Sequence, residues 1–403
     1  MSDKLAINGG KPVFAENELN SIRPAWPPLY PETEERLIEV YRSRKWSNCK
    51  KYESLLTKEF AEFQGSKYSV WMANGTVTLE CALLALGVGP GDEVIGPGIS
   101  WVATAQAPLY VGATPVFVDV DPDTMCIDPA KIEEAITERT KAIIPVHIYS
   151  AVADMDKINA IAKKHDLFVI EDCAHCHGTK QHGVGTGALG DIGSFSFQLS
   201  KIMTGGEGGC CTTNNEKYAD LLFRLSHITN SMLFPKEKPP VGLMCHQYRF
   251  TDFQAAIIYD QLQHQAELRA KRQKNAALMR ELIKDVPGVK MQASSYEDDF
   301  RDYYFIAFLL QREYIRPGVD RKEIYAALLA EGFQLHEAWG APMYDMIAWN
   351  IPANLFVKHD THNCDEIMYK RLMCTDNTLF LTDEKTITRC AEALTKVINA
   401  FSK

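Results

Sequence analysis

The chain has 403 residues, of which 46% are hydrophobic and 24% charged, a composition typical of soluble globular proteins. This length can bury a large core and favours two or three domains. The net charge of −9 argues against a nucleic-acid or anionic-membrane surface as the main partner, and no apolar run approaches the roughly 20 residues of a membrane span. The N-terminus lacks the features of a secretory signal, so a cytoplasmic location is expected.

The first 30 residues are rich in proline and asparagine, which predicts an irregular arm lying over the rest of the molecule. Residues 31–44 then predict a helix, because Pro31 and acidic residues stand in the first turn and basic residues near the end.

Between about residues 50 and 215, short apolar runs alternate with segments of helical period. The runs are continuous rather than alternating, as expected for strands covered on both faces. This succession predicts a parallel sheet with helices on both faces. Strands are expected at 69–72, 92–98, 114–120, 141–148 and 167–172, with helices at 76–88, 100–112, 130–139 and 154–166.

Residues 251–286 predict a long helix that leaves the sheet domain, and the remaining residues mix strand and helix patterns. The predicted organisation is therefore an arm (1–30), a large α/β domain (31–255), and a connecting helix with a smaller C-terminal α+β domain (256–403).

The segment EDCAHCHG at 171–178 is open to several interpretations. Its C-x-x-C-H spacing is that of a c-type haem attachment site, and the same residues could form a zinc cluster, a redox dithiol or the end of a strand that carries a catalytic acid. The 11 cysteines are scattered and odd in number, which indicates mostly buried thiols. A zinc site would need a second ligand pair, which the adjacent Cys210 and Cys211 do not supply, so no metal is predicted.

Polar and aromatic residues follow several predicted strands, at the edge where open α/β sheets bind ligands. Gly75 and Thr76 open a helix and could offer backbone N–H groups to an anion, although a simple helix cap is the alternative. Trp101 could stack on a flat ring, or belong to the core.

Two charged residues complete this set. Asp172, at the end of a strand, could pair with a ring nitrogen, although such carboxylates also serve as caps and metal ligands. Lys201 lies between GSFSFQ and MTGGEGG, a glycine-rich setting unlike an exposed lysine face, with Ser196 five residues before it. A phosphate cradle, an apolar ring surface, a carboxylate and an amine are what pyridoxal 5'-phosphate (PLP) requires.

A dinucleotide site is the competing interpretation. GVGPG at 87–91 resembles a nucleotide loop, but it ends a predicted helix and precedes a strand. A dinucleotide fingerprint requires the reverse order, so this interpretation fails.

The ordered set NGT, SWVAT, PVFVDVD, TKAIIPVH, ADMD, VIEDCAH and GSFSFQ-x-x-K-x-MT-x-GEGG resembles the sugar aminotransferases of the DegT/DnrJ type, which are fold-type I PLP enzymes. The match spans most of residues 1–260. It implies a large, mainly parallel sheet domain with helices on both faces, a smaller C-terminal α+β domain, and PLP as the cofactor. EDCAHCHG then resembles the end of a cofactor-binding strand.

The resemblance also implies roles for individual residues. Lys201 matches the lysine that binds the cofactor covalently and moves protons, and Asp172 matches the partner of the ring nitrogen. His175 falls near the cofactor's 3-hydroxyl and Trp101 on the ring face. The matched phosphate ligands are Gly75, Thr76 and Ser196.

Family members form dimers with shared active sites, so a homodimer is expected. The partner chain usually contributes an asparagine to the phosphate site. Here the corresponding residue is Gln247, which would take that role. Ser150 stands close to the site, where the family often has glycine.

The predicted activity is transfer of an amino group from glutamine or glutamate to a ketone on a cyclitol or sugar in secondary metabolism. His336 alone remains of a pattern seen in enzymes of nucleotide-linked keto sugars, which favours an acceptor without a nucleotide. The alternatives are a nucleotide-linked keto-sugar aminotransferase, elimination with aromatisation as in aminohydroxybenzoate formation, and a PLP-binding regulator without turnover.

Overall fold

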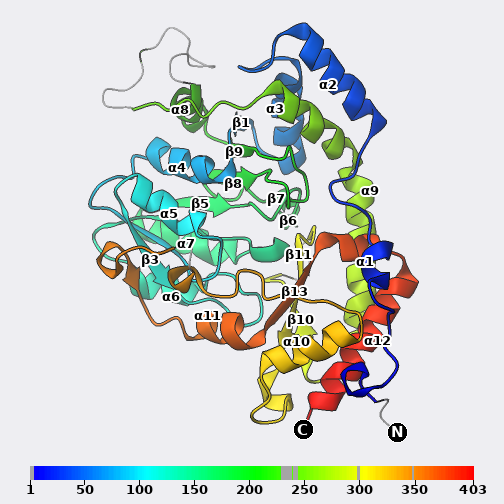
Figure 1. Cartoon of the computed structure of the whole chain (residues 1–403). Helices are drawn as coiled ribbons and strands as arrows, with labels where there is room; N and C mark the ends of the chain where they lie inside the picture. The colour runs from blue at the N-terminus through cyan, green and yellow to red at the C-terminus, as the bar shows by residue number, and fades with distance from the viewer. Residues whose placement is uncertain (1–3, 228–237, 239–243, 297–299, 347–348) are drawn as a thin grey trace.

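The computed structural model describes residues 4–227, 238, 244–296, 300–346 and 349–403. Its centre is an eight-stranded sheet of order β1-β9-β8-β5-β4-β2-β3-β12 (Figure 1). The strands are β1 (Tyr68–Met72), β2 (Glu93–Pro97), β3 (Thr114–Val118), β4 (Thr140–Ile143), β5 (Phe168–Asp172), β8 (Ile192–Ser196), β9 (Gly209–Thr213) and β12 (Val357–Lys358).

Most neighbouring strands of this sheet are parallel. Only β9 runs against its two neighbours, β1 and β8. The predicted fold class, a mainly parallel sheet with helices, is confirmed. The short strand β12 comes from the C-terminal part of the chain yet pairs with β3. The domain boundaries at residues 30 and 255 stay a prediction.

Both faces of the sheet are buried. On one face Val94 and Ala142 share an apolar cluster with α4 (Gly75–Ala85) and α8 (Glu216–His227). The next residues along the same strands, Ile95 and Ile143, join a different cluster with α6 (Pro129–Ala135) and α7 (Met155–His165). Side chains of a strand alternate between faces, so continuous apolar strands result from cover on both sides. The remaining helices at the sheet are α3 (Lys51–Gln64), beside β1, and α5 (Ala103–Tyr110), beside α4.

The N-terminal arm is more regular than the sequence predicts, because it contains the short helix α1 (Glu18–Ile22). The Glu18 carboxylate accepts the Ala15 N–H at 2.8 Å and so stabilises the turn that leads into this helix. Helix α2 (Pro31–Ser43) begins at the predicted proline. Helix α9 (Asp252–Ile283) begins at a capping box of Thr251 and Gln254.

Helix α9 extends from the large sheet to a second, antiparallel sheet of order β10-β11-β13 (Figure 1). This sheet packs on α10, α12 and the end of α9 around a separate apolar cluster. The elements are β10 (Val289–Met291), β11 (Phe305–Leu310), α10 (Arg321–Ala330), β13 (Leu372–Asp376) and α12 (Glu384–Phe401), with α11 (His362–Glu366) and the small pair β6 (Lys180–Gln181) and β7 (Val184–Gly185) elsewhere.

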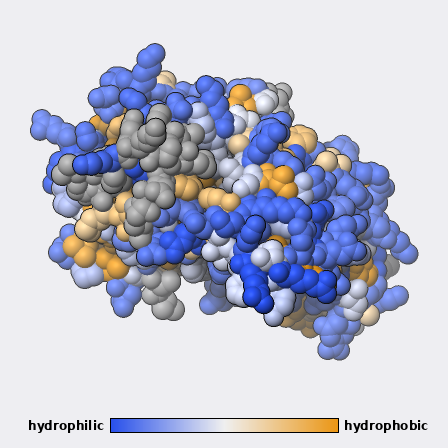
Figure 2. Space-filling view, turned by 90° about the horizontal axis from the view of Figure 1, so that it is seen from above, coloured by the Kyte–Doolittle hydropathy of each residue, from blue (hydrophilic) through white to orange (hydrophobic). Residues whose placement is uncertain are grey.

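The surface seen from above is mostly hydrophilic, with apolar side chains in small groups (Figure 2). In the described part of the chain, no helix is both long and apolar enough to cross a bilayer.

Candidate active site

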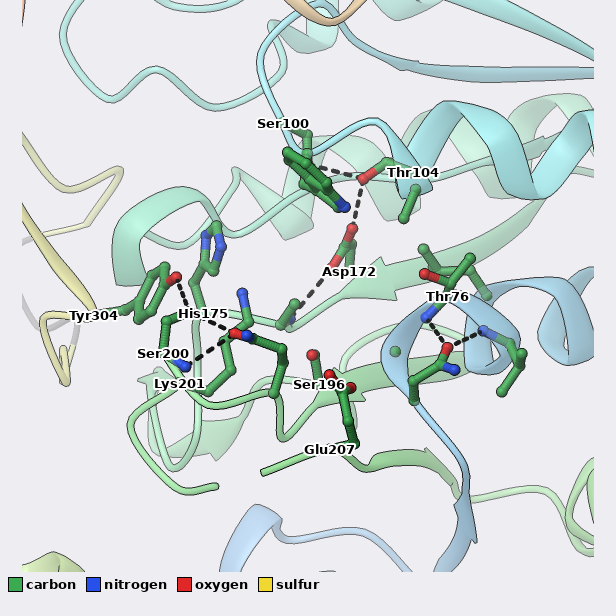
Figure 3. Close-up of a pocket in the computed structure, with 18 of the residues that line it drawn as sticks. Thr76, Ser100, Thr104, Asp172, His175, Ser196, Ser200, Lys201, Glu207 and Tyr304 are labelled. Carbon is green, nitrogen blue, oxygen red and sulfur yellow. Dashed lines mark hydrogen bonds between the residues drawn. The ribbon is translucent and has the colours of Figure 1, made fainter. Parts of the chain in front are cut away.

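A cavity of about 530 Å³ lies at the carboxyl ends of β1, β2, β5 and β8. Its lining includes seven of the residues predicted from the sequence (Figure 3). They are Gly75, Thr76, Trp101, Asp172, His175, Ser196 and Lys201. Segments separated by more than 100 residues therefore converge as the topology of a parallel sheet predicts.

The start of α4 forms one end of the cavity. Asn74 caps this helix, since its Oδ1 accepts the N–H groups of Thr76 and Val77 at 3.0 and 3.1 Å. The sequence predicts N–H groups open to an anion here, whereas in the structure the Asn74 side chain, which was not predicted as the cap, already accepts two of them. A Cβ at Gly75 would lie 2.6 Å from the Cβ of Ser196, so only glycine lets these two segments approach so closely.

Trp101 lines the cavity just before α5 and is 48% exposed, so it is not a core tryptophan. Its ring lies 6.5 Å from that of Trp339, with the two planes tilted by 49°. Trp339 comes from the C-terminal part of the chain and also lines the cavity. The two indoles therefore give this cavity apolar ring surfaces from two segments that are far apart in the sequence.

Asp172 is buried at the end of β5. Its carboxylate accepts hydrogen bonds from the Thr104 hydroxyl at 2.7 Å and the Ala174 N–H at 3.2 Å, both neutral donors. Ser100 bonds to Thr104 at 2.8 Å and extends this chain (Figure 3). Burial raises the pKa of Asp172, because these donors and the more distant Lys201 only partly offset the loss of water. The carboxylate thus suits a cationic group in the cavity.

His175 is held as a neutral imidazole. Burial, together with the nearby Lys201 amine, lowers the pKa of His175 well below its usual range. Its Nδ1 accepts the Tyr149 N–H at 3.3 Å, so the proton resides on Nε2. The ring stacks on Tyr304 with centroids 4.3 Å apart. His175 can therefore donate one hydrogen bond from Nε2.

Ser150 connects His175 to Tyr304 through two hydrogen bonds. Its hydroxyl donates to the His175 carbonyl at 2.6 Å and accepts the Tyr304 N–H at 3.1 Å. The residue has φ +72°, a left-handed conformation that glycine adopts more easily. Serine at this position links the strand end of the cavity to its C-terminal wall.

Lys201 lies in the turn after β8, and its Nζ stands 4.5 Å from the ring centroid of Tyr304. The Tyr304 hydroxyl bonds to Ser200 at 2.8 Å, which fixes the ring beneath the amine (Figure 3). Trp26 of the N-terminal arm donates from Nε1 to the Lys201 carbonyl at 3.2 Å. The arm thus reaches the turn that carries the lysine.

The residues present fit PLP. Gly75 lets the start of α4 lie against Ser196 at one end of the cavity, and among the described residues the hydrogen-bond donors to the buried Asp172 are the neutral Thr104 hydroxyl and Ala174 N–H. Comparison with known proteins agrees. Residues 29–393 match the model of the DegT/DnrJ/EryC1/StrS aminotransferase family.

The chain belongs to this family. It is a PLP-dependent aminotransferase. It is 39% identical over 357 residues, 84% of this chain and 82% of the relative, to L-glutamine:2-deoxy-scyllo-inosose aminotransferase of Streptoalloteichus tenebrarius. It is 38% identical to a putative L-glutamine:3-amino-2,3-dideoxy-scyllo-inosose aminotransferase of Micromonospora echinospora, covering 83% of this chain and 79% of the relative.

Among solved structures, the 3-amino-5-hydroxybenzoic acid synthase superposes with a TM-score of 0.83 at 27% identity. The alignment covers 94% of this chain and 99% of the synthase. The family fold therefore extends into the C-terminal part, where the sequence motifs weaken.

The family assignment leaves EDCAHCHG as the end of β5 and the turn after it. Cys173 and Cys176 are both fully buried, which leaves no room for a covalently attached haem. In the part of the chain that the structure describes, the Cys and His side chains of 173–177 do not gather as one set of metal ligands.

Gln247 is the predicted site residue outside the cavity. It is exposed, and its side chain accepts a hydrogen bond from Arg249. Its contact with a partner chain stays a prediction. His336 also lies outside the lining, with its Nδ1 accepting the Ala338 N–H at 3.1 Å.

Residues that the sequence analysis missed come mainly from two places. Thr104 stands one turn after Ser100 on the same helix start, a spacing that could have indicated the bond between them. Tyr304 and Trp339 lie in the weakly matching C-terminal part, where no local pattern distinguishes them from core aromatics.

Proposed function

We propose that this aminotransferase takes its amino group from L-glutamine and delivers it to a ketone on a small cyclitol of the 2-deoxy-scyllo-inosose type. The similarity to the enzymes of that name, at 39% identity over 84% of the chain, carries the proposal. The C-terminal aromatic wall supports it, because Trp339 and Tyr304 offer ring surfaces suited to a carbocycle.

We assign the cofactor to the residues that line the cavity. When bound, PLP supplies an electron sink for negative charge at the substrate carbon. Asp172 would pair with the ring nitrogen, and His175 would donate from Nε2 to the 3-hydroxyl oxygen. Trp101 would cover the ring face. The phosphate would lie among Gly75, Thr76 and Ser196, with Gln247 of a second copy completing the site in a homodimer.

Lys201 would hold the cofactor through its amine. Once released by the donor, that amine would carry a proton to and from the substrate carbon, a role that lysine shares with other general acid–base groups. The Tyr304 ring, 4.5 Å from Nζ, would contact the amine and restrict its position between the two half-reactions.

The decisive experiment measures the reactions with the amino donor and with the ketone acceptor one after the other. The cofactor-loaded enzyme is first mixed with glutamine or glutamate, and the change in cofactor absorption is followed. The aminated enzyme is then offered 2-deoxy-scyllo-inosose, 3-amino-2,3-dideoxy-scyllo-inosose or a nucleotide-linked 4-keto sugar. We expect glutamine and 2-deoxy-scyllo-inosose to give the highest kcat/KM.

The likeness to 3-amino-5-hydroxybenzoic acid synthase favours a second candidate, elimination with aromatisation. Mass analysis of the product distinguishes the two, because amination retains the saturated ring and aromatisation does not. Aromatic product, or preference for the nucleotide-linked sugar, would overturn the proposed acceptor. Bound PLP without any exchange of amine would instead indicate a regulator.

A further inference from the structure

We propose that Cys49, Glu53 and His227 form a zinc site, separate from the cofactor cavity. Glu53 lies in the first turn of α3, Cys49 just before that helix, and His227 is the last residue of α8. Cys49 and His227 are 178 residues apart in sequence, so no spacing pattern predicts their meeting.

The three ligand atoms face one another, and two of their three separations exceed by a few tenths of an ångström those that a tetrahedral zinc ion requires. Cys49 Sγ lies 3.6 Å from Glu53 Oε1 and 3.9 Å from His227 Nε2, and Nε2 lies 4.0 Å from Oε1. Zinc bonds of about 2.3 Å to sulfur and about 2.0–2.2 Å to nitrogen and oxygen place tetrahedral ligands roughly 3.4–3.6 Å apart. Movements of a few tenths of an ångström would therefore bring all three into bonding distance.

The orientation of each ligand is already fixed. His227 bonds through Nδ1 to the Ser226 hydroxyl at 2.8 Å, which leaves Nε2 facing the other two groups. Phe223 stacks on the imidazole at 4.2 Å and restricts its rotation. Outer contacts of this kind are typical of metal-binding histidines.

The carboxylate is equally constrained. Glu53 Oε2 accepts the Cys49 N–H at 2.7 Å, so Oε1 points toward the thiol and the imidazole. Glu53 is 1% exposed. A cation at this position would offset the cost of keeping that carboxylate charged.

The exposure of Cys49 and the charges of the three ligands are compatible with zinc. Cys49 is only half-buried, which provides a path for the ion. Binding would expel the thiol proton, and the carboxyl proton where present, into solvent. One thiolate, one imidazole and one carboxylate leave the fourth tetrahedral position to water. A thiolate and an imidazole together favour zinc over magnesium or calcium.

A second cluster of possible metal ligands already has its carboxylate oxygens occupied by hydrogen bonds. His147, Glu171 and Cys173 also lie close together and are fully buried. However, Glu171 accepts hydrogen bonds from His147 and from the N–H groups of Gly187, Leu189 and Gly190, all between 2.7 and 2.9 Å. Both carboxylate oxygens are occupied, so this cluster holds the β5 turn rather than an ion.

Metal titration of the full-length, cofactor-loaded protein tests the proposal. Chelator-treated protein is titrated with Zn²⁺ in competition with a chromogenic chelator, and bound metal is counted by mass spectrometry. We expect one tightly bound zinc per chain. Cys49→Ser should weaken binding more than about 100-fold, because loss of a ligand exceeds the 10–100-fold cost of losing an outer contact.

The matched control is Cys245→Ser, which removes another half-buried thiol outside the cluster and should leave zinc affinity unchanged. Absence of stoichiometric zinc in the wild-type protein, or equal affinity in Cys49→Ser, would overturn the proposal. Should Cys49→Ser fail to fold, X-ray absorption of the zinc-loaded wild type decides. One sulfur at about 2.3 Å supports the site, whereas no sulfur or several sulfurs contradict it.

Discussion

The two walls of the active-site cavity differ in origin and in chemistry. The wall at the strand ends carries three polar groups: Asp172 ends β5, Ser196 ends β8, and Lys201 lies in the turn after β8. The opposite wall carries two aromatic residues, Tyr304 and Trp339, from the C-terminal part of the chain. The strand-end wall matches the needs of the cofactor, and the aromatic wall those of an acceptor ring.

The two walls touch at several points. Tyr304 stacks on His175 and is bonded through its N–H to Ser150 and through its hydroxyl to Ser200. The strand-end wall carries the groups that would bond to the cofactor, whereas the aromatic wall offers ring surfaces. Changes on the strand-end wall should therefore stop the chemistry, and changes on the aromatic wall should reduce it by smaller factors.

The largest effect is expected from Lys201→Ala. Removing the amine eliminates both the covalent hold on the cofactor and the proton carrier, and the latter alone contributes about 10²–10⁴-fold in general acid–base catalysis. Amino transfer from glutamine, measured by mass spectrometry, should fall by at least that factor. Lys180→Ala, at a half-buried lysine outside the cavity lining, should retain activity. Residual transfer within tenfold of wild type would refute the role of Lys201.

Asp172→Asn should lower the activity and, in the cofactor-free protein, raise the stability. Loss of the carboxylate removes an opposite charge worth roughly 1–3 pKa units at the ring nitrogen, so activity should fall about 10- to 1000-fold. Burial raises the pKa of Asp172, so its contribution to stability is present at acidic pH and lost as the pH rises through the folded-state pKa.

The cofactor-free Asp172→Asn protein should therefore be more stable than wild type at neutral pH. This difference in stability should shrink as the pH falls toward the ordinary pKa of an aspartic acid. Thermal unfolding of both proteins across that range provides the measurement. A variant less stable than wild type at neutral pH would show that the charged carboxylate is favourably solvated in the free protein.

The strand-end wall was also the part that the sequence could predict. Asp172 ends a predicted strand, and parallel strands bring their carboxyl ends to one edge. Lys201 was instead singled out by its glycine-rich setting and by the family resemblance, because no strand was predicted before it. Periodicity predicted strands β1 to β5 and helices α4 to α7, but it did not predict β8, β9 or β12.

The aromatic wall could not be predicted, because its position depends on how the C-terminal sheet packs against the large one. Tyr304 stands more than 100 residues after Lys201, beside a strand whose other residues are core. The cap at Asn74 was missed for a different reason. Asparagine is as good a cap as threonine, and only the backbone geometry shows which residue precedes the helix.

Tyr304→Leu tests the aromatic wall with a smaller expected effect. The variant removes the ring beneath the Lys201 amine, an interaction worth about 0.5–2 kcal/mol, which corresponds to a roughly 2- to 30-fold loss in kcat. Tyr304→Phe keeps the ring and loses only the bond to Ser200, so it should retain most of the activity. Equal losses in the two variants would assign the effect to the hydroxyl instead.

A change in stability rather than in activity is expected at Ser150, where the two walls are joined. Ser150→Ala loses the hydrogen bonds to His175 and Tyr304 while keeping the left-handed backbone, so it should destabilise the protein by about 1–3 kcal/mol. Ser150→Gly loses the same bonds but relieves about 1–2 kcal/mol of backbone strain, against about 0.4–1 kcal/mol of added unfolded-state entropy. Urea unfolding should therefore rank the glycine variant between alanine and wild type. If the alanine variant unfolds at the same urea concentration as the wild type, the hydrogen bonds of Ser150 to His175 and Tyr304 do not stabilise the protein.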